Sequence, residues 1–197
     1  TVSGGIRLDQ ARARYFLNIT DPTQYTLSTL KKYLGHVGIQ FHGKIEKAMV
    51  PEIATKLLTH ESEPLMLALQ GLNKFSNNFV AEQILKTIGA EKYGTPGTTL
   101  KGLKVFEDYL IGLGYQPDQY KILDGSGLSR QNRLSPQMMI DILRHVKNDL
   151  GVYPEFVSAL GVMGVDGNVK NRMRGVKSAG RARVKTGTLN FVSALSG

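Results

Sequence analysis

The chain has 197 residues, of which 41% are hydrophobic and 21% are charged, proportions typical of a globular protein and too apolar for a disordered one. It contains no cysteine, which excludes disulfides, thiolate nucleophiles and cysteine metal sites. The net charge is +9, and no apolar run approaches the roughly 20 residues that a membrane-spanning helix needs.

The first part of the chain predicts a helix and two short strands. A helix is expected over 21–34, where Leu27, Leu30 and Leu34 recur at spacings of three and four. Alternation of apolar and polar residues predicts a strand over 39–45, and 55–59 is a second strand candidate.

Four further helices are expected in the middle of the chain. A strongly apolar one, predicted to be deeply buried, covers 63–74, and an amphipathic one follows through Val80 and Ile88 to end near Gly89. The others cover 98–113 and 135–148, with a glycine-rich loop, 124–130, between them. A glycine-rich exposed segment over 161–180 and two strands within 184–195 complete the pattern, so the predicted fold class is α+β.

The C-terminal segment is strongly basic. No acid follows Asp166, and seven basic residues do: Lys170, Arg172, Arg174, Lys177, Arg181, Arg183 and Lys185. Either this segment is a solvated loop, or it gathers anionic ligands for a nearby site. No aromatic residues are interleaved with the charges, so we predict no nucleic-acid partner. The four histidines (His36, His42, His60 and His145) lack ligand-like spacing, so we predict no metal site. We also expect no cofactor.

Two short motifs carry chemistry: Ser76-Asn77-Asn78 between two helices, and Lys185-Thr186-Gly187 in a predicted strand. A serine acylase needs a nucleophile, a base, oxyanion donors and a cation with a hydroxyl to hold a substrate carboxylate. A Ser-x-Asn turn that projects from a helix junction can place a hydroxyl and an amide in a cleft. The second motif supplies positive charge, a hydroxyl donor and, at the glycine, room for a substrate along the strand.

Together these motifs resemble the second and third motifs of the set Ser-x-x-Lys, Ser-x-Asn, Lys-Thr-Gly that penicillin-binding proteins and serine β-lactamases share. The stretches 73–82, 124–130 (DGSGLSR) and 184–189 are similar to those of D-alanyl-D-alanine carboxypeptidases of the penicillin-binding protein 4 type. The separation of the motifs, 185 − 76 = 109 residues, also suits that family. The resemblance implies an incomplete part of the penicillin-binding, β-lactamase-like transpeptidase fold.

The same resemblance implies a role for each position. Ser76, Asn78 and Lys185 would be catalytic, and Thr186, Gly187 and Thr188 would bind substrate, with the Thr188 N–H as an oxyanion donor. The expected activity is that of a serine-type carboxypeptidase/endopeptidase acting on peptidoglycan peptides that end in D-Ala-D-Ala, through an acyl-enzyme that β-lactams also form. The resemblance also implies a periplasmic or extracytoplasmic location.

One stretch, Ser28-Thr29-Leu30-Lys31, matches the first motif, but we interpret Ser28 as a decoy. Ser28 lies about a turn inside a predicted helix, whereas a nucleophile belongs at a helix N-terminus, where free N–H groups stabilise an oxyanion. Lys31 is next to Lys32 on a polar side, and a lysine base needs burial or a neighbouring cation to lower its pKa. In the resembling family the nucleophile lies far upstream of the second motif.

We therefore expect residues 1–197 to be the C-terminal portion of the penicillin-binding domain, with the first-motif portion upstream, the nucleophile unknown and the fragment alone inactive. The serines of the 124–130 loop do not form a Gly-x-Ser-x-Gly elbow, and the loop is predicted to line the cleft wall. The alternatives are a β-lactamase-like hydrolase, for which we place no deacylating base, and a catalytically dead module that binds cell-wall peptides or a partner.

Overall fold

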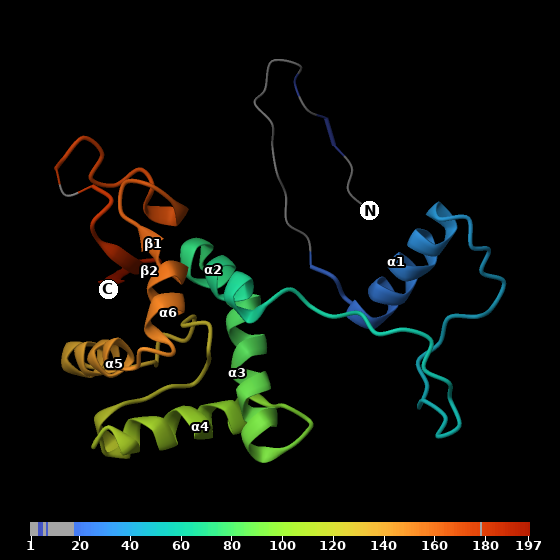
Figure 1. The fold of residues 1–197 in the computed structure, drawn as a ribbon, viewed down its shortest axis with the longest axis horizontal. Helices are drawn as coiled ribbons and strands as arrows, with labels where there is room; N and C mark the ends of the chain where they lie inside the picture. The colour runs from blue at the N-terminus through green and yellow to red at the C-terminus, as the bar shows by residue number, and fades with distance from the viewer. Residues whose placement is uncertain (1–3, 6, 8–17, 178) are drawn as a thin grey trace. The chain divides into compact units, whose positions relative to one another are not determined.

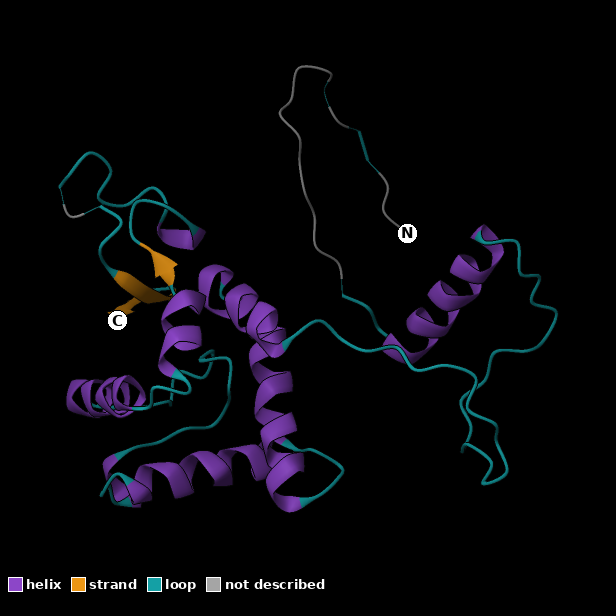
Figure 2. Ribbon diagram, viewed as in Figure 1, coloured by secondary structure: helices purple, strands orange, loops and turns teal. Residues whose placement is uncertain are grey.

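The computed structural model describes residues 4, 5, 7, 18–177 and 179–197. The chain divides into two compact units, Thr1–Thr59 and His60–Gly197, shown by their helices and strands in Figures 1 and 2. No helix in the described ranges is long and apolar enough to cross a bilayer.

The first unit contains one described helix, α1 (Pro22–His36). The Asp21 side chain caps it by accepting a hydrogen bond from the Gln24 N–H at 2.9 Å. The predicted strands at 39–45 and 55–59 are wrong, because both segments are irregular. A strand needs a partner for its backbone groups, and the described part of this unit offers none.

The second unit holds the other helices, and most follow the predicted pattern. Where the pattern predicted an end near Gly89, the helix continues four residues further, because Gly89 packs directly against Gly102 of the next helix. A short helix after Gly151 was missed, since seven residues span too few turns to show a period. The α-helices are α2 (Leu65–Phe75), α3 (Asn78–Tyr93), α4 (Thr99–Gly112), α5 (Pro136–Asn148) and α6 (Tyr153–Ala159), and the 3-10 helices are η1 (Pro117–Gln119) and η2 (Gly167–Val169).

Three strands form one antiparallel sheet in the order β1-β2-β3. They are β1 (Gly161–Val162), β2 (Arg183–Leu189) and β3 (Val192–Ser196). The two predicted strands are β2 and β3, which pair as a hairpin with Lys185 opposite Ser196. The combination of helices with this sheet confirms the α+β class.

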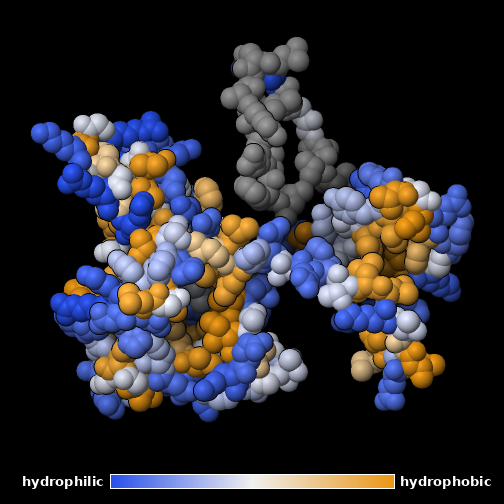
Figure 3. Space-filling view, in the orientation of Figure 1, coloured by the Kyte–Doolittle hydropathy of each residue, from blue (hydrophilic) through white to orange (hydrophobic). Residues whose placement is uncertain are grey.

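Two expectations about burial are wrong. The segment 161–180 is not a wholly exposed excursion, because its Met163 and Val169 are buried against Val184 of β2. Nor is α2 deeply buried, since Leu65 and Phe75 are 63% and 65% exposed. Apolar side chains of this unit reach the surface, some of them on the face in Figure 3. The period of α2 identifies an apolar helix, but only the elements packed on it determine which side chains are covered.

Candidate active site

The junction between α2 and α3 presents the first motif. Ser76 ends α2 in the left-handed conformation, with φ 56° and ψ 54°, which non-glycine residues rarely adopt. Asn77 then caps α3, its side chain accepting from the Val80 N–H at 3.2 Å. Asn78 is the first residue of α3. The two helices therefore change direction at Ser76, which leaves its hydroxyl at the turn instead of inside a helix.

The second motif lies on β2, and its lysine reaches the first. Lys185 Nζ donates to Ser76 Oγ at 2.5 Å and to the Thr186 carbonyl oxygen at 2.6 Å. These hydrogen bonds join residues 109 positions apart in the sequence. The structure thus brings together the two motifs that sequence analysis singled out.

Both motifs line one pocket of about 410 Å³. Three parts of the chain form its walls: the α2–α3 junction, the strands β2 and β3, and the loop 125–128. A side chain on Gly187 would lie 3.6 Å from the Ala194 side chain, which also lines the pocket, so these two small residues leave space beside β2. All six predicted site residues border this pocket: Ser76, Asn78, Lys185, Thr186, Gly187 and Thr188.

Burial lowers the pKa of Lys185 from its ordinary value, because desolvation disfavours the charged form. A lysine with a lowered pKa exchanges a proton with a bound hydroxyl more readily than a solvated one. The Ser76–Lys185 pair can therefore move a proton within the pocket. Within the described ranges, no group of three or more His, Asp and Glu side chains could hold a metal ion.

One carboxylate, Glu82, holds the glycine-rich loop against α3, and a second, Asp124, holds the loop together from within. Glu82 Oε1 accepts from the N–H groups of Gly125 and Ser126 at 2.8 and 2.9 Å. Asp124 accepts from the N–H groups of Gly127 and Ser129 at 2.6 and 2.7 Å. Charge-assisted bonds of this kind fix a loop in one conformation. One feature of the sequence could have pointed to Glu82. It follows Asn78 by four residues, so the two side chains share one face of the helix.

The loop also contacts the strand hairpin, because Arg130 donates to the Asn190 carbonyl oxygen at 2.9 Å in the β2–β3 turn. The prediction of a loop over 124–130 that lines the cleft is confirmed, with Gly125, Ser126, Gly127 and Leu128 in the pocket wall.

Ser28 belongs to the first unit, where it lies in the second turn of α1, seven residues after the Asp21 cap. Its backbone is therefore inside the helix, as the pattern predicted. Lys31 is exposed, with Nζ 5.4 Å from the centre of the Phe41 ring. That Ser28 is a decoy stays a prediction.

The basic side chains from Lys170 to Arg183 are all exposed. They have no ion-pair partner among the described residues. Lys185 differs from them, since it is half-buried and turned toward Ser76.

The chain is similar to known D-Ala-D-Ala carboxypeptidases. The model of the D-Ala-D-Ala carboxypeptidase 3 (S13) family matches residues 1–197. The chain is 34% identical over its whole length to a D-alanyl-D-alanine carboxypeptidase of Actinomadura sp., of which it spans 38%. It is 28% identical over 88% of its length to the D-alanyl-D-alanine carboxypeptidase DacB of Haemophilus influenzae, of which it spans 36%.

Among solved structures, the chain is similar to penicillin binding protein 4 (dacB) from Haemophilus influenzae complexed with a β-lactam. The TM-score is 0.78 at 25% identity, over 92% of this chain and 42% of that one. A second structure of the same protein matches with a TM-score of 0.79 at 25% identity, over 91% of this chain and 40% of that one. The chain thus spans less than half the length of these relatives.

Proposed function

Since the chain belongs to the D-Ala-D-Ala carboxypeptidase 3 (S13) family, we propose that its gene product is a serine-type D-alanyl-D-alanine carboxypeptidase and endopeptidase. It cleaves peptidoglycan peptides that end in D-Ala-D-Ala through an acyl-enzyme, and β-lactams acylate the same serine. The reaction takes place in the periplasm or elsewhere outside the cytoplasm.

The observation that carries this proposal is the hydrogen bond from Lys185 Nζ to Ser76 Oγ, at 2.5 Å, inside a pocket shared with Thr186 and Gly187. It links a hydroxyl to a half-buried lysine whose pKa burial has lowered. Such a pair supports general acid–base catalysis, because the proton acceptor and donor already lie within hydrogen-bond reach.

Each residue then has a part in the reaction. Ser76, with Lys185, relays a proton to the leaving amine of the terminal D-alanine. Asn78 holds the substrate's amide. Lys185 and the Thr186 hydroxyl hold its C-terminal carboxylate, while Gly187 leaves room beside the strand. The N–H of Thr188 is one of the two donors to the oxyanion that forms at the scissile carbonyl.

The acylated serine belongs to a Ser-x-x-Lys motif in the part of the gene product outside these 197 residues, and Ser28 is not that serine. The 197 residues alone are therefore inactive. The chain spans only 36–38% of the length of these relatives, which supports this assignment.

Intact-mass measurement after incubation with a labelled penicillin tests the proposal on the full-length gene product and on residues 1–197 separately. We expect one adduct on the full-length protein, mapped by peptide sequencing outside 1–197, and none on the shorter chain. An adduct on Ser28 would overturn the assignment of the nucleophile. No adduct on the folded full-length protein would favour a catalytically dead peptide-binding module, and rapid turnover of the penicillin would favour a β-lactamase-like hydrolase.

A further inference from the structure

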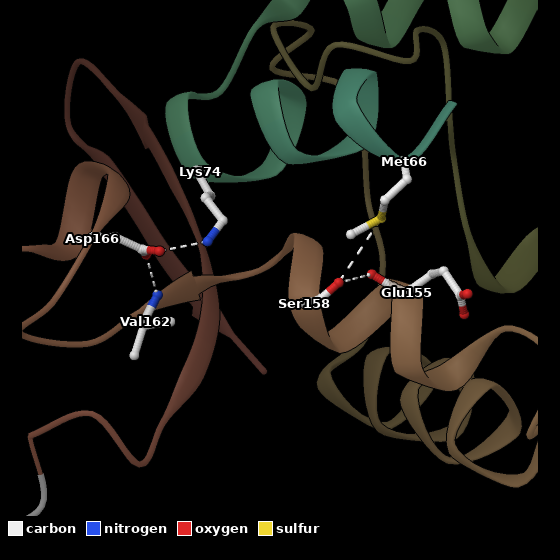
Figure 4. A network of polar contacts seen from close by, with 6 residues as sticks. All are labelled: Met66, Lys74, Glu155, Ser158, Val162 and Asp166. Atoms are coloured by element: carbon white, nitrogen blue, oxygen red, sulfur yellow. Dashed lines mark hydrogen bonds and ion pairs between the residues drawn. The ribbon is translucent and has the colours of Figure 1, made fainter. Parts of the chain in front are cut away.

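The end of α2 is held by an ion pair that the proposed mechanism does not use. Lys74 Nζ donates to Asp166 Oδ2, as Figure 4 shows. The pair is partly buried, with side chains 17% and 36% exposed. Lys74 lies two residues before Ser76, so this contact restrains the backbone from which the Ser76 hydroxyl projects.

The same carboxylate also holds the sheet. Asp166 Oδ1 accepts from the Val162 N–H at 2.7 Å, and Val162 belongs to β1. That strand pairs with β2 through Gly161 opposite Val184 and Val162 opposite Arg183. Val184 immediately precedes Lys185. One side chain thus links the helix end that carries Ser76 to the strand edge that carries Lys185.

The backbones at this point are in direct contact. Gly167, next to Asp166, has φ +57°, and a side chain on it would lie 2.7 Å from the Lys74 carbonyl oxygen. Glycine is therefore required both by conformation and by space. The segment that contains Asp166 packs on the last turn of α2 without an intervening side chain.

Ser76 needs such a restraint. Its left-handed conformation is one that non-glycine residues keep only where the surroundings hold it. Burial alone would raise the pKa of Asp166, but the hydrogen bonds from Lys74 and Val162, with the charges of Lys74 and Arg183, bring it below the ordinary value. The carboxylate is therefore ionised at neutral pH and the ion pair persists.

We propose that Asp166, through Lys74 and the Val162 N–H, is a positioning residue that holds the Ser76 hydroxyl against Lys185. This inference rests on the proposed function, because it assigns Asp166 a role in the reaction at that site. Asp166 does not touch the pocket; it acts through the two elements that meet there.

Three variants of the full-length protein separate the contacts. Asp166→Asn keeps an oxygen for the Val162 N–H but removes the charge, Lys74→Met removes the cation, and Asp166→Ala removes both contacts. The control is Arg144→Gln, which breaks the Arg144–Asp141 pair on α5, where the Arg144 side chain is 72% exposed. Lys74→Arg, which retains the ion pair, is the conservative variant.

The assay measures penicillin binding, the rate constant of acylation and the number of acylated sites per molecule. Misplacing a catalytic group by about 1 Å costs about 100-fold in rate. We therefore expect Asp166→Ala to slow acylation by about 10- to 100-fold per active site, with Asp166→Asn and Lys74→Met intermediate and penicillin binding changed less than twofold. Lys74→Arg should recover most of the rate, and the control should match the wild type.

A merely structural role predicts a different pattern. Loss of folded protein would lower the number of sites that react, but each remaining site would react at the wild-type rate. Acylation per site within twofold of wild type for Asp166→Ala and Asp166→Asn would overturn the proposal.

A second measurement does not depend on activity. Crystal structures of the wild type and Asp166→Asn should show the Ser76 Oγ to Lys185 Nζ separation increasing from 2.5 Å to beyond 3.5 Å, the limit of a hydrogen bond. An unchanged separation would overturn the positioning role even in an active enzyme. If the wild type is not acylated at all, the proposed function fails, and this separation still decides the role of Asp166.

Discussion

The crossing of α3 and α4 allows a stringent test of the packing. Gly102 of α4 faces α3 so closely that an added side-chain carbon would lie 2.2 Å from the Leu85 carbonyl oxygen, where ordinary contact begins at 3.4 Å. Gly89 of α3 faces α4 in the same way, 2.6 Å from the Gly102 nitrogen. Both neighbours are backbone atoms, so Gly102→Ala forces the helices apart.

Two opposing effects set the magnitude. In a helix interior, alanine is favoured over glycine by about 1 kcal/mol. Overpacking costs about 1–3 kcal/mol, and a clash with backbone on this scale belongs at the upper end, about 3 kcal/mol. We expect Gly102→Ala to destabilise the protein by about 2 kcal/mol, which lowers the Tm of a chain of this size by about 4–8 °C.

Gly71→Ala is the matched control, because Gly71 lies inside α2 with nothing within 4 Å of an added side-chain carbon. There the gain in helix propensity is unopposed, and the Tm should rise by about 2–4 °C. Thermal unfolding followed by circular dichroism measures both variants. A Tm for Gly102→Ala at or above that of the wild type would refute the close approach of the two helices.

Three further predictions concern the site. Lys185→Ala should abolish acylation by penicillin in the full-length protein while its circular dichroism spectrum stays unchanged; undiminished acylation would remove the assignment of the Lys-Thr-Gly motif. Burial lowers the pKa of Lys185 in the folded protein below the ordinary value of 10.5. At any pH between these two pKa values, the unfolded chain therefore binds more protons than the folded one. The free energy of unfolding of the wild type should therefore rise relative to that of Lys185→Met as pH increases through this window, and a constant difference in denaturant titrations would contradict the shift. The basic segment 170–183 should raise the rate of association with anionic peptides in stopped-flow measurements, with the gain fading between about 0.01 and 1 M salt as the Debye length falls from about 30 to about 3 Å; a salt-independent rate would mean a solvated loop.

Local patterns in the sequence were sufficient for most helices and for the hairpin. Apolar spacing and capping residues such as Thr98 and Ser135 act over one or two turns, so α4 and α5 begin where the sequence predicted. Elements whose existence depends on a partner were not predictable in this way. The two-residue strand β1 exists because it pairs with β2, whereas 39–45 alternates like a strand and finds no partner among the described residues.

The residues that the structure brings together in the candidate site were also predicted from the sequence, because Ser76, Asn78 and Lys185 occur in short motifs with a characteristic spacing. Their geometry was not. The left-handed conformation of Ser76 and its hydrogen bond from Lys185 depend on the end of a helix meeting a strand 109 residues later. Glu82 and Asp166 are ordinary acids in the sequence, and only the folded chain places them on the loop backbone and on Lys74. The spacing of apolar residues along the sequence predicts contacts within a helix or a hairpin. Contacts between residues 43 to 109 positions apart form only when separate elements pack together.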